Sequence, residues 1–214
     1  TTNLKHVEQL NIVRGDGVYV YDDSGKEYLE GLAGLWCASL GYGNAELIEA
    51  ITDQLKTLSY SHMFGGRTHN VVIQLAEQLS DMLPVKNSKI FFANSGSEAN
   101  DSHIKMLRYY FNVTGEPQKK KIIALERSYH GVTVASAALT GLPANHTHFD
   151  LPVDALGVIR AESPHYYRGR KDNETEREFC ERIIGNLEDL ILRENPETIA
   201  AFVAEPIGGA SGVV

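Results

Sequence analysis

The 214-residue chain is predicted to be an α/β protein with a mainly parallel sheet. From Ile90 onward, short segments with strand character alternate with longer segments in which apolar residues keep helical spacing, which is the pattern of strands joined by crossover helices. Two apolar runs, residues 121–125 and 198–204, are the strongest strand candidates. The second is apolar on both faces, as a central parallel strand would be.

The first 30 residues have a different pattern. Residues 12–30 are predicted to form short strands joined by tight turns, because residues 17–22 alternate in polarity and Asp23-Ser24-Gly25-Lys26 supplies turn residues. Residues 141–173 contain three prolines and are too long for an ordinary connection, so we expect a loop with a functional or interface role. The remaining predicted elements are helices over 44–58 (capped by Asn44), 68–82, 98–112, 132–139 and 174–194, and a short strand over 90–93.

Composition excludes several classes of function. The formal net charge is −8 and no basic patch offsets it, which argues against binding to nucleic acids or anionic membranes. No run approaches the roughly 18 apolar residues of a membrane span. The two cysteines, Cys37 and Cys180, are far apart and lack CxxC spacing, and the start Thr1–His6 lacks the apolar core of a secretory signal. These features predict a cytoplasmic protein.

The segment from Ile90 to Asn100 is the strongest functional signal. A short strand is expected to lead through the small-residue turn Ser95-Gly96-Ser97 into a long helix, which places free backbone N–H groups at the positive end of the helix dipole. This arrangement binds anions, above all phosphate. Ser95 and Glu98 also match an S-x-x-E capping box, so the same residues could form only a well-capped helix. Local chemistry leaves both interpretations open.

Four motifs together resemble a known family. Asn94-Ser95-Gly96-Ser97-Glu98-Ala99-Asn100 resembles the phosphate cup of the class III aminotransferases, which use pyridoxal 5'-phosphate (PLP). The motifs Tyr129-His130-Gly131 and Ala204-Glu205-Pro206-Ile207 match the family in order and spacing. The run from Gly31 to Gly43, which contains Leu35-Trp36-Cys37, is typical of its ω-transaminase branch. The resemblance extends over essentially the whole chain.

The resemblance implies a fold-type I PLP-dependent transferase, similar to aspartate aminotransferase. Residues 1–58 would be an N-terminal segment with small-domain strands and the first helix. Residues 59–214 would be the first part of the PLP-binding large domain, truncated before the Schiff-base lysine. The family's lysine and the aspartate that pairs with the cofactor's pyridinium nitrogen both lie C-terminal to the Glu205-Pro206 motif. None of the chain's lysines lies in an apolar strand-end context that would suit imine chemistry, so no catalytic residue is expected among them.

The family's functional positions map onto eight residues of this chain. Tyr129 would stack on the pyridine ring and border the substrate, although a tyrosine that merely packs at a strand end is the alternative. His130 would brace the cofactor pocket or be purely structural, and Glu205 would lie at the active site or at a solvated strand end. The implied cofactor-binding residues are Ser95, Gly96, Ser97, Tyr129, His130 and Glu205, and the implied substrate-binding residues are Trp36, Phe64 and Tyr129.

No metal site is predicted. His146, His148 and Asp150 are close in sequence, but two histidines two residues apart in a proline-rich segment without cysteine partners are a weak signal. The chain also lacks a Walker lysine, a G-x-S-x-G motif and a Rossmann G-x-G-x-x-G motif.

The implied activity is transfer of an amino group from a primary amine or ω-amino acid to a keto acid such as pyruvate, with PLP as cofactor. The partners would be these small molecules and a second copy of the chain. A homodimer or a higher homo-oligomer is expected, in which the Phe64 loop reaches the neighbouring pocket. A same-fold aminomutase of the glutamate-semialdehyde type is one alternative. A truncated product that binds PLP or phosphate without turnover is another.

Overall fold

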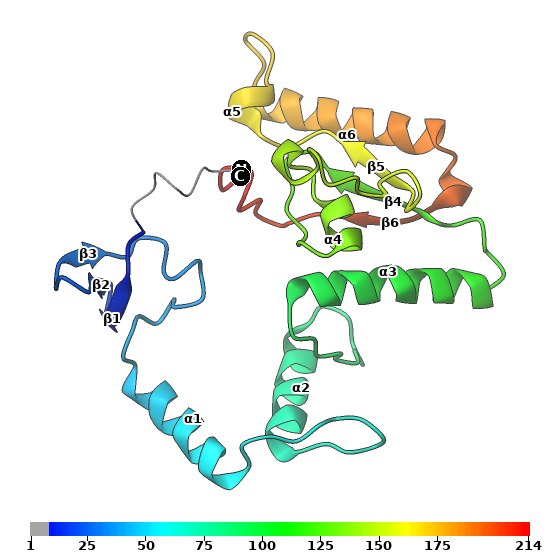
Figure 1. Ribbon diagram of the computed structural model, residues 1–214. Coiled ribbons are helices and arrows are strands. Elements are labelled where there is room, and N and C mark those ends of the chain that lie inside the picture. Colours follow the sequence, from blue (N-terminus) through cyan, green and yellow to red (C-terminus); the bar gives the residue numbers. More distant parts are fainter. Residues whose placement is uncertain (1–8) are drawn as a thin grey trace. The chain divides into compact units, whose positions relative to one another are not determined.

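The computed structural model describes residues 9–214, which form two compact units that divide between Ile90 and Phe91 (Figure 1). The start of the chain, Thr1–His6, lies outside the described residues. The predicted division at residue 58 refers to the domains of the family and stays a prediction.

The N-terminal unit contains a small antiparallel sheet. Its strands are β1 (Ile12–Asp16), β2 (Tyr19–Asp22) and β3 (Glu27–Leu29), in the order β1-β2-β3. The short strands and tight turns predicted over residues 12–30 are therefore confirmed.

One carboxylate holds the turn between β2 and β3. Asp22 Oδ1 accepts hydrogen bonds from Ser24 Oγ at 2.6 Å, from the Ser24 N–H at 2.9 Å and from the Lys26 N–H at 2.9 Å. Its other oxygen accepts from the Tyr28 hydroxyl at 2.8 Å. Asp22 is buried, so these four donors replace water around its charge.

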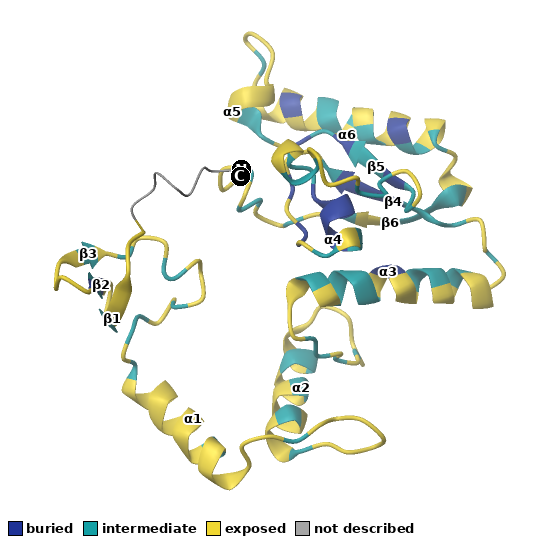
Figure 2. Cartoon of the chain, in the orientation of Figure 1, coloured by how far each residue is buried: buried dark blue, intermediate teal, exposed yellow. Residues whose placement is uncertain are grey.

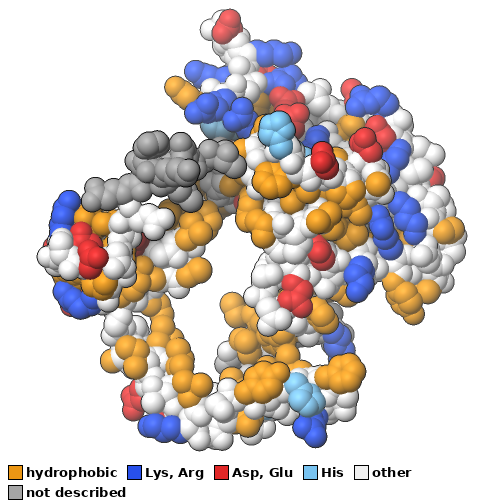
Figure 3. Space-filling model, in the orientation of Figure 1, with side chains coloured by type: hydrophobic (Ala, Val, Ile, Leu, Met, Phe, Trp, Pro, Cys, Tyr) orange, Lys and Arg blue, Asp and Glu red, His pale blue; other side chains and the backbone are white. Residues whose placement is uncertain are grey.

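Two amphipathic helices follow in the same unit. Helix α1 (Ala45–Thr57) begins at the predicted cap, where Asn44 Oδ1 accepts from the Leu47 N–H at 3.0 Å, and helix α2 spans Asn70–Met82. Neither helix buries a residue among the described part of the chain. Apolar side chains are exposed over both helices, as Figures 2 and 3 show. The helices are thus correctly predicted, but their apolar faces contribute nothing to a described core.

The C-terminal unit is built on a parallel sheet, as predicted. Strand β4 (Lys121–Leu125) lies between β5 (Val158–Ala161) and β6 (Ile199–Val203), and both pairings are parallel. The middle of β4 is the most deeply buried part of the sheet: Ile122, Ile123 and Ala124 are at most 2% exposed.

Helices cover both faces of this sheet (Figure 1). Helices α3 (Gly96–Val113) and α4 (Val134–Leu139) pack on one face, and α6 (Glu176–Arg193) packs on the other. These three helices confirm the predicted ones to within two residues at each end. Alternate residues of β4 supply the two cores, one with Ile104, Ile122, Ala124, Ala138, Leu139 and Val158, the other with Ile123, Ala161 and Leu190.

Strand β6 forms as predicted, whereas the strand predicted over residues 90–93 does not. Within the described residues β6 pairs only with β4, and Phe202 is 50% exposed. The central position expected for this strand therefore stays a prediction. Residues 90–93 form no strand and enter α3 as an irregular segment. Apolar β-favouring residues make a strand only where a neighbouring strand offers hydrogen bonds, and neither described sheet offers one here.

The long loop predicted over residues 141–173 contains more structure than expected. Strand β5 lies within it, together with the 3₁₀ helix η2 (Pro143–Asn145) and the short helix α5 (Tyr166–Gly169). The four residues of β5 include Arg160 and carry no clear alternation. Pairing with β4 forms this strand, and local sequence does not reveal such pairing.

We expect the turn held by Asp22 to loosen in acid. Hydrogen bonds from the Ser24 hydroxyl, and then from Tyr28, lower the pKa of Asp22 from 3.8 to about 2. Because the folded-state pKa is depressed, the stabilisation is complete above about pH 4 and is lost as the pH falls towards 2. The amide protection factors of Ser24 and Lys26, measured by hydrogen exchange, should fall in this window. In the Asp22→Asn variant this pH dependence should be absent, and a wild-type midpoint at the unperturbed value of 3.8 would contradict the prediction.

Candidate anion and ring-binding site

Helix α3 begins with two backbone N–H groups that have no protein acceptor within the described part of the chain, those of Gly96 and Ser97. Ser95 is the cap, and its hydroxyl accepts from the Glu98 N–H at 3.1 Å. The Glu98 carboxylate turns back to Asn94, accepting from its backbone N–H at 2.8 Å and from its side-chain amide at 3.1 Å. The two free N–H groups lie at the positive end of an 18-residue helix.

The two interpretations of this turn prove compatible. Ser95 makes its half of the predicted capping box, but Glu98 bonds to Asn94 instead of to the cap residue. This cap leaves the N–H groups of Gly96 and Ser97 free for an external acceptor. A Cβ built on Gly96 would meet no heavy atom within 4 Å outside its own neighbours, so the turn is open on this side. A phosphate, with several acceptor oxygens, fits such a turn.

Residues 129–132 leave the carboxyl end of β4 and pack against the start of α3. Gly131 is buried with φ +128°, and a Cβ there would overlap Ser97 Oγ and lie 2.9 Å from Ser136 Cβ. Glycine therefore permits the close approach. Ser97 Oγ accepts from the Val132 N–H at 3.0 Å, which leaves its own hydrogen available to an anion.

Tyr129 is held by its backbone, while its ring remains accessible. Tyr129 is 42% exposed, and its backbone N–H donates to Glu205 Oε1 at 2.8 Å. Glu205 Oε2 accepts from the Gly209 N–H at 3.1 Å. Glu205 thus joins the carboxyl end of β4 to the segment after β6. The structure places Glu205 beside Tyr129 as a support for its backbone, a role that the sequence did not indicate.

His130 is buried directly behind Tyr129. Its N–H donates to Thr140 Oγ1 at 2.9 Å, and its carbonyl accepts from Asn100 Nδ2 at 2.7 Å. Burial lowers the pKa of His130, against an opposing effect of the Glu205 charge, and the charge of Arg160 lowers it further. The ring is therefore neutral at neutral pH. Its Nε2 has no hydrogen-bond partner among the described residues. This geometry favours the bracing role over direct contact with a ligand.

Trp36 and Phe64 belong to the N-terminal unit. Both side chains are largely exposed, Trp36 at 60% and Phe64 at 85%. Trp36 lies in a tight run of turns with a positive φ of 66°. Their predicted contact with substrate stays a prediction.

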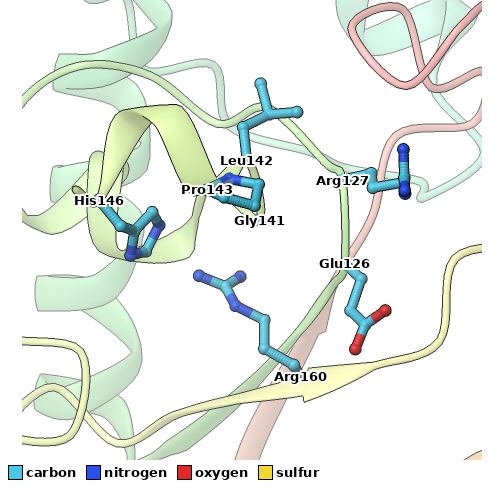
Figure 4. A pocket seen from close by; sticks show the side chains of 7 residues that line it. All are labelled: Glu126, Arg127, Gly141, Leu142, Pro143, His146 and Arg160. Carbon is cyan, nitrogen blue, oxygen red and sulfur yellow. The ribbon is translucent and has the colours of Figure 1, made fainter.

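A separate cavity of about 550 Å³ lies at the ends of β4 and β5 (Figure 4). Its most buried cation, Arg160, points from β5 towards the end of α4, where its guanidinium donates to the carbonyls of Thr140 (2.8 Å), Ala138 (2.5 Å) and Leu139. His146 Nε2 also lies 2.5 Å from the Thr140 carbonyl. These groups cap the carboxyl end of α4, so the guanidinium is already committed within the protein.

His146, His148 and Asp150 lie on the segment that follows α4. His148 and Asp150 both have positive φ, at 66° and 49°. Residues 9–214 contain no cluster of three or more His, Cys, Asp or Glu side chains placed to hold a metal ion.

Sequence reasoning missed several polar residues that support the site. Asp101 Oδ1 accepts from Thr133 Oγ1 at 2.7 Å and from Ser136 Oγ at 2.8 Å, and Asn100 anchors the His130 carbonyl. The sequence did contain a signal for these supporting residues. Ser97 and Asp101 share the helix face of Ile104, the one buried residue of α3, so polar side chains stand where core contacts are expected.

We expect Glu205→Ala to free the segment around Tyr129. Removing the carboxylate leaves the N–H groups of Tyr129 and Gly209 without their acceptor. Amide exchange at both positions should then accelerate by roughly tenfold, which corresponds to the net contribution of about one hydrogen bond. Hydrogen exchange measured by NMR or mass spectrometry would test this. Replacement of the exposed Glu188 on α6 is the matched control and should leave both amides unchanged.

Comparisons with known proteins agree with this geometry. The family model of class-III aminotransferases (Aminotransferase class-III) matches residues 2–214. Gamma-aminobutyrate transaminase 1, mitochondrial, of Oryza sativa subsp. japonica is 52% identical over 209 residues, which cover 97% of this chain and 40% of that protein. Vanillin aminotransferase of Capsicum chinense is 51% identical, with 97% and 45% covered.

Solved structures give the same result. A thermostable omega transaminase 4-fold mutant from Pseudomonas jessenii superimposes with a TM-score of 0.94 at 51% identity, over 99% of this chain and 46% of that one. The omega transaminase from the same organism in complex with PMP also gives 0.94, at 50% identity, with 99% and 46% covered. The chain therefore spans less than half the length of these relatives. The fold is that of fold-type I transaminases, and the chain belongs to the class-III aminotransferase family.

Proposed function

We propose that the full-length gene product is a PLP-dependent transaminase that moves an amino group from a primary amine or ω-amino acid to a keto acid such as pyruvate. The observation that carries this proposal is the pair of free N–H groups at the start of α3, joined by hydrogen bonds to the segment that presents Tyr129. The relatives named gamma-aminobutyrate transaminase and omega transaminase support an amine or ω-amino acid as donor, and the relative named vanillin aminotransferase is named for an aldehyde that lacks a carboxylate.

Each residue of the site has a defined task under this proposal. The N–H groups of Gly96 and Ser97, with the hydroxyls of Ser95 and Ser97, would hold the phosphate. Tyr129 would lie against the pyridine ring. When bound, PLP supplies an electron sink for the carbon that carries the amine.

The supporting residues keep this arrangement fixed. Glu205 fixes the backbone of Tyr129, and neutral His130 fills the space behind it without adding a charge. Trp36 and Phe64 would shape the pocket for the organic part of the amine. No residue of 1–214 is assigned to proton transfer, and the lysine that would do this work is expected outside this range.

We also propose the domain division into residues 1–58 and 59–214, and a homodimer or larger homo-oligomer. The apolar residues exposed on α1 and α2 support association, because helices with such faces are stable in water only when these faces are covered.

A cytoplasmic location rests on the two unpaired, exposed cysteines, Cys37 and Cys180. The plant relatives named mitochondrial or chloroplastic make the organelles the alternative to test. Among the described residues no helix has the length and apolar character to cross a bilayer.

The proposed activity is tested with the full-length gene product, PLP and pairs of amine donors and keto acids. We expect alanine to form from pyruvate with γ-aminobutyrate or a primary amine as donor. Ser97→Asp should abolish turnover and weaken PLP binding by about a hundredfold or more, because a carboxylate repels the phosphate at short range. Isomerisation of glutamate semialdehyde without a keto acid would instead support the aminomutase. PLP binding without turnover of any donor would support the non-catalytic product.

Tyr129 provides a second test of the site. We expect Tyr129→Ala to weaken PLP binding by roughly tenfold through loss of ring contact, and to shift the absorbance band of the bound cofactor. Tyr129→Phe keeps the aromatic face and should be much milder. Tyr167, which is 79% exposed on α5, offers the matched control Tyr167→Ala. Wild-type affinity and spectrum in Tyr129→Ala would mean that this side chain only packs at the strand end.

A further inference from the structure

We propose that Asp101 is a positioning residue that sets the spacing between the anion-binding turn, residues 95–97, and the ring of Tyr129. This inference rests on the proposed function, because it concerns how one ligand with a phosphate and an aromatic ring meets both places at once. The side-chain hydrogen bonds of Asp101 go to Thr133 and Ser136, which belong to neither place. Asp101 acts through the segment that joins them.

Asp101 caps a helix other than its own. Thr133 is the cap residue of α4, but its side chain makes no cap hydrogen bond. The acceptor for the first turn of α4 comes instead from α3: Asp101 Oδ1 accepts from the Ser136 N–H at 3.1 Å and from Thr133 Oγ1 at 2.7 Å. One carboxylate oxygen therefore fixes the start of α4 on the second turn of α3.

Ser136 connects Asp101 to the anion-binding turn itself. Its hydroxyl lies 2.8 Å from Asp101 Oδ1 and 2.8 Å from the Ser97 carbonyl oxygen. Ser136 is fully buried, so water cannot replace either contact. Because the Ser136 hydroxyl contacts both oxygen atoms, its orientation is restricted. It links the Asp101 side chain to the Ser97 carbonyl in a contact that excludes water.

The same segment carries Tyr129 at its other end. Ser97 Oγ holds the Val132 N–H at 3.0 Å, and Asn100 Nδ2 holds the His130 carbonyl at 2.7 Å. Tyr129 is the next residue. The distance between the free N–H groups of α3 and the Tyr129 ring is thus fixed by hydrogen bonds spread over residues 130–136, and Asp101 makes three of them.

A ligand that binds at two places is sensitive to their spacing, whereas a ligand that binds at one is not. A misplacement of about 1 Å can cost an enzyme up to a hundredfold in rate, and the affinity of a ligand held at two places should depend on their spacing in the same direction. Inorganic phosphate uses only the turn at the start of α3. Pyridoxamine 5'-phosphate uses both the turn and the ring of Tyr129, and it has no aldehyde, so no bond to a lysine contributes to its affinity.

The test titrates the apo form of the full-length gene product with each of these two probes by calorimetry. In Asp101→Ala we expect the Kd of pyridoxamine 5'-phosphate to rise by about tenfold, and the Kd of inorganic phosphate to stay within about twofold. Asp101→Asn keeps the Oδ1 acceptor, so it should restore most of the affinity. The matched control is Thr175→Ala, which removes the cap of α6, where Thr175 Oγ1 accepts from the Glu178 N–H at 3.3 Å. This control should lower the melting temperature comparably and leave both Kd values unchanged.

The other possible outcomes would contradict either the role of Asp101 or the proposed function. Unchanged affinity for both probes in Asp101→Ala, or a parallel loss for both, would overturn the role of Asp101 in spacing. If Asp101→Ala does not fold, Ser136→Ala removes only the shared hydroxyl and should show the same selective loss, and its absence would again overturn the inference. Failure of the wild-type protein to bind pyridoxamine 5'-phosphate at all would instead remove the proposed function.

Discussion

The contact between the first two turns of α3 and residues 130–136 is the constraint on which the candidate site depends. The N-terminus of α3 alone would offer an anion two N–H groups, as many helices do. Tyr129 alone would be one of several exposed aromatic residues. Hydrogen bonds accepted by Ser97 and Asp101 and donated by Asn100 hold the two features together, and Gly131 makes the approach close enough for these bonds to form.

The charged side chains around this contact are carboxylates that accept hydrogen bonds. The carboxylates of Glu98, Asp101 and Glu205 each accept hydrogen bonds from backbone N–H groups of neighbouring segments. Burial keeps His130 neutral. The helix dipole and the free N–H groups at the start of α3 supply a positive field that suits a doubly charged phosphate.

The sequence predicted those parts of the fold that local patterns encode. The strand β4 and the helices α3 and α6 have clear spacing, and Asn44 and Ser95 are typical caps, so these elements appear where expected. Strand β5 and the irregular residues 90–93 depend on which strands become neighbours, and local patterns do not carry that information. The site follows the same division. Residues that could meet a ligand were identified through their motifs, while the supporting role of Glu205 and the contacts of Asp101 arise only when distant segments meet.

The shortness of α4 has a consequence for how the protein folds. Six residues are far below the roughly 12 to 15 that an isolated helix needs to persist in water. Both of its ends are completed from elsewhere, by Asp101 of α3 at the start and by Arg160 of β5 at the end. We therefore expect α4 to form only after α3 and the sheet have come together, as a late element of folding. The ring-bearing segment that precedes α4 is ordered in the same step, so the site should appear all at once and be lost all at once when this unit opens.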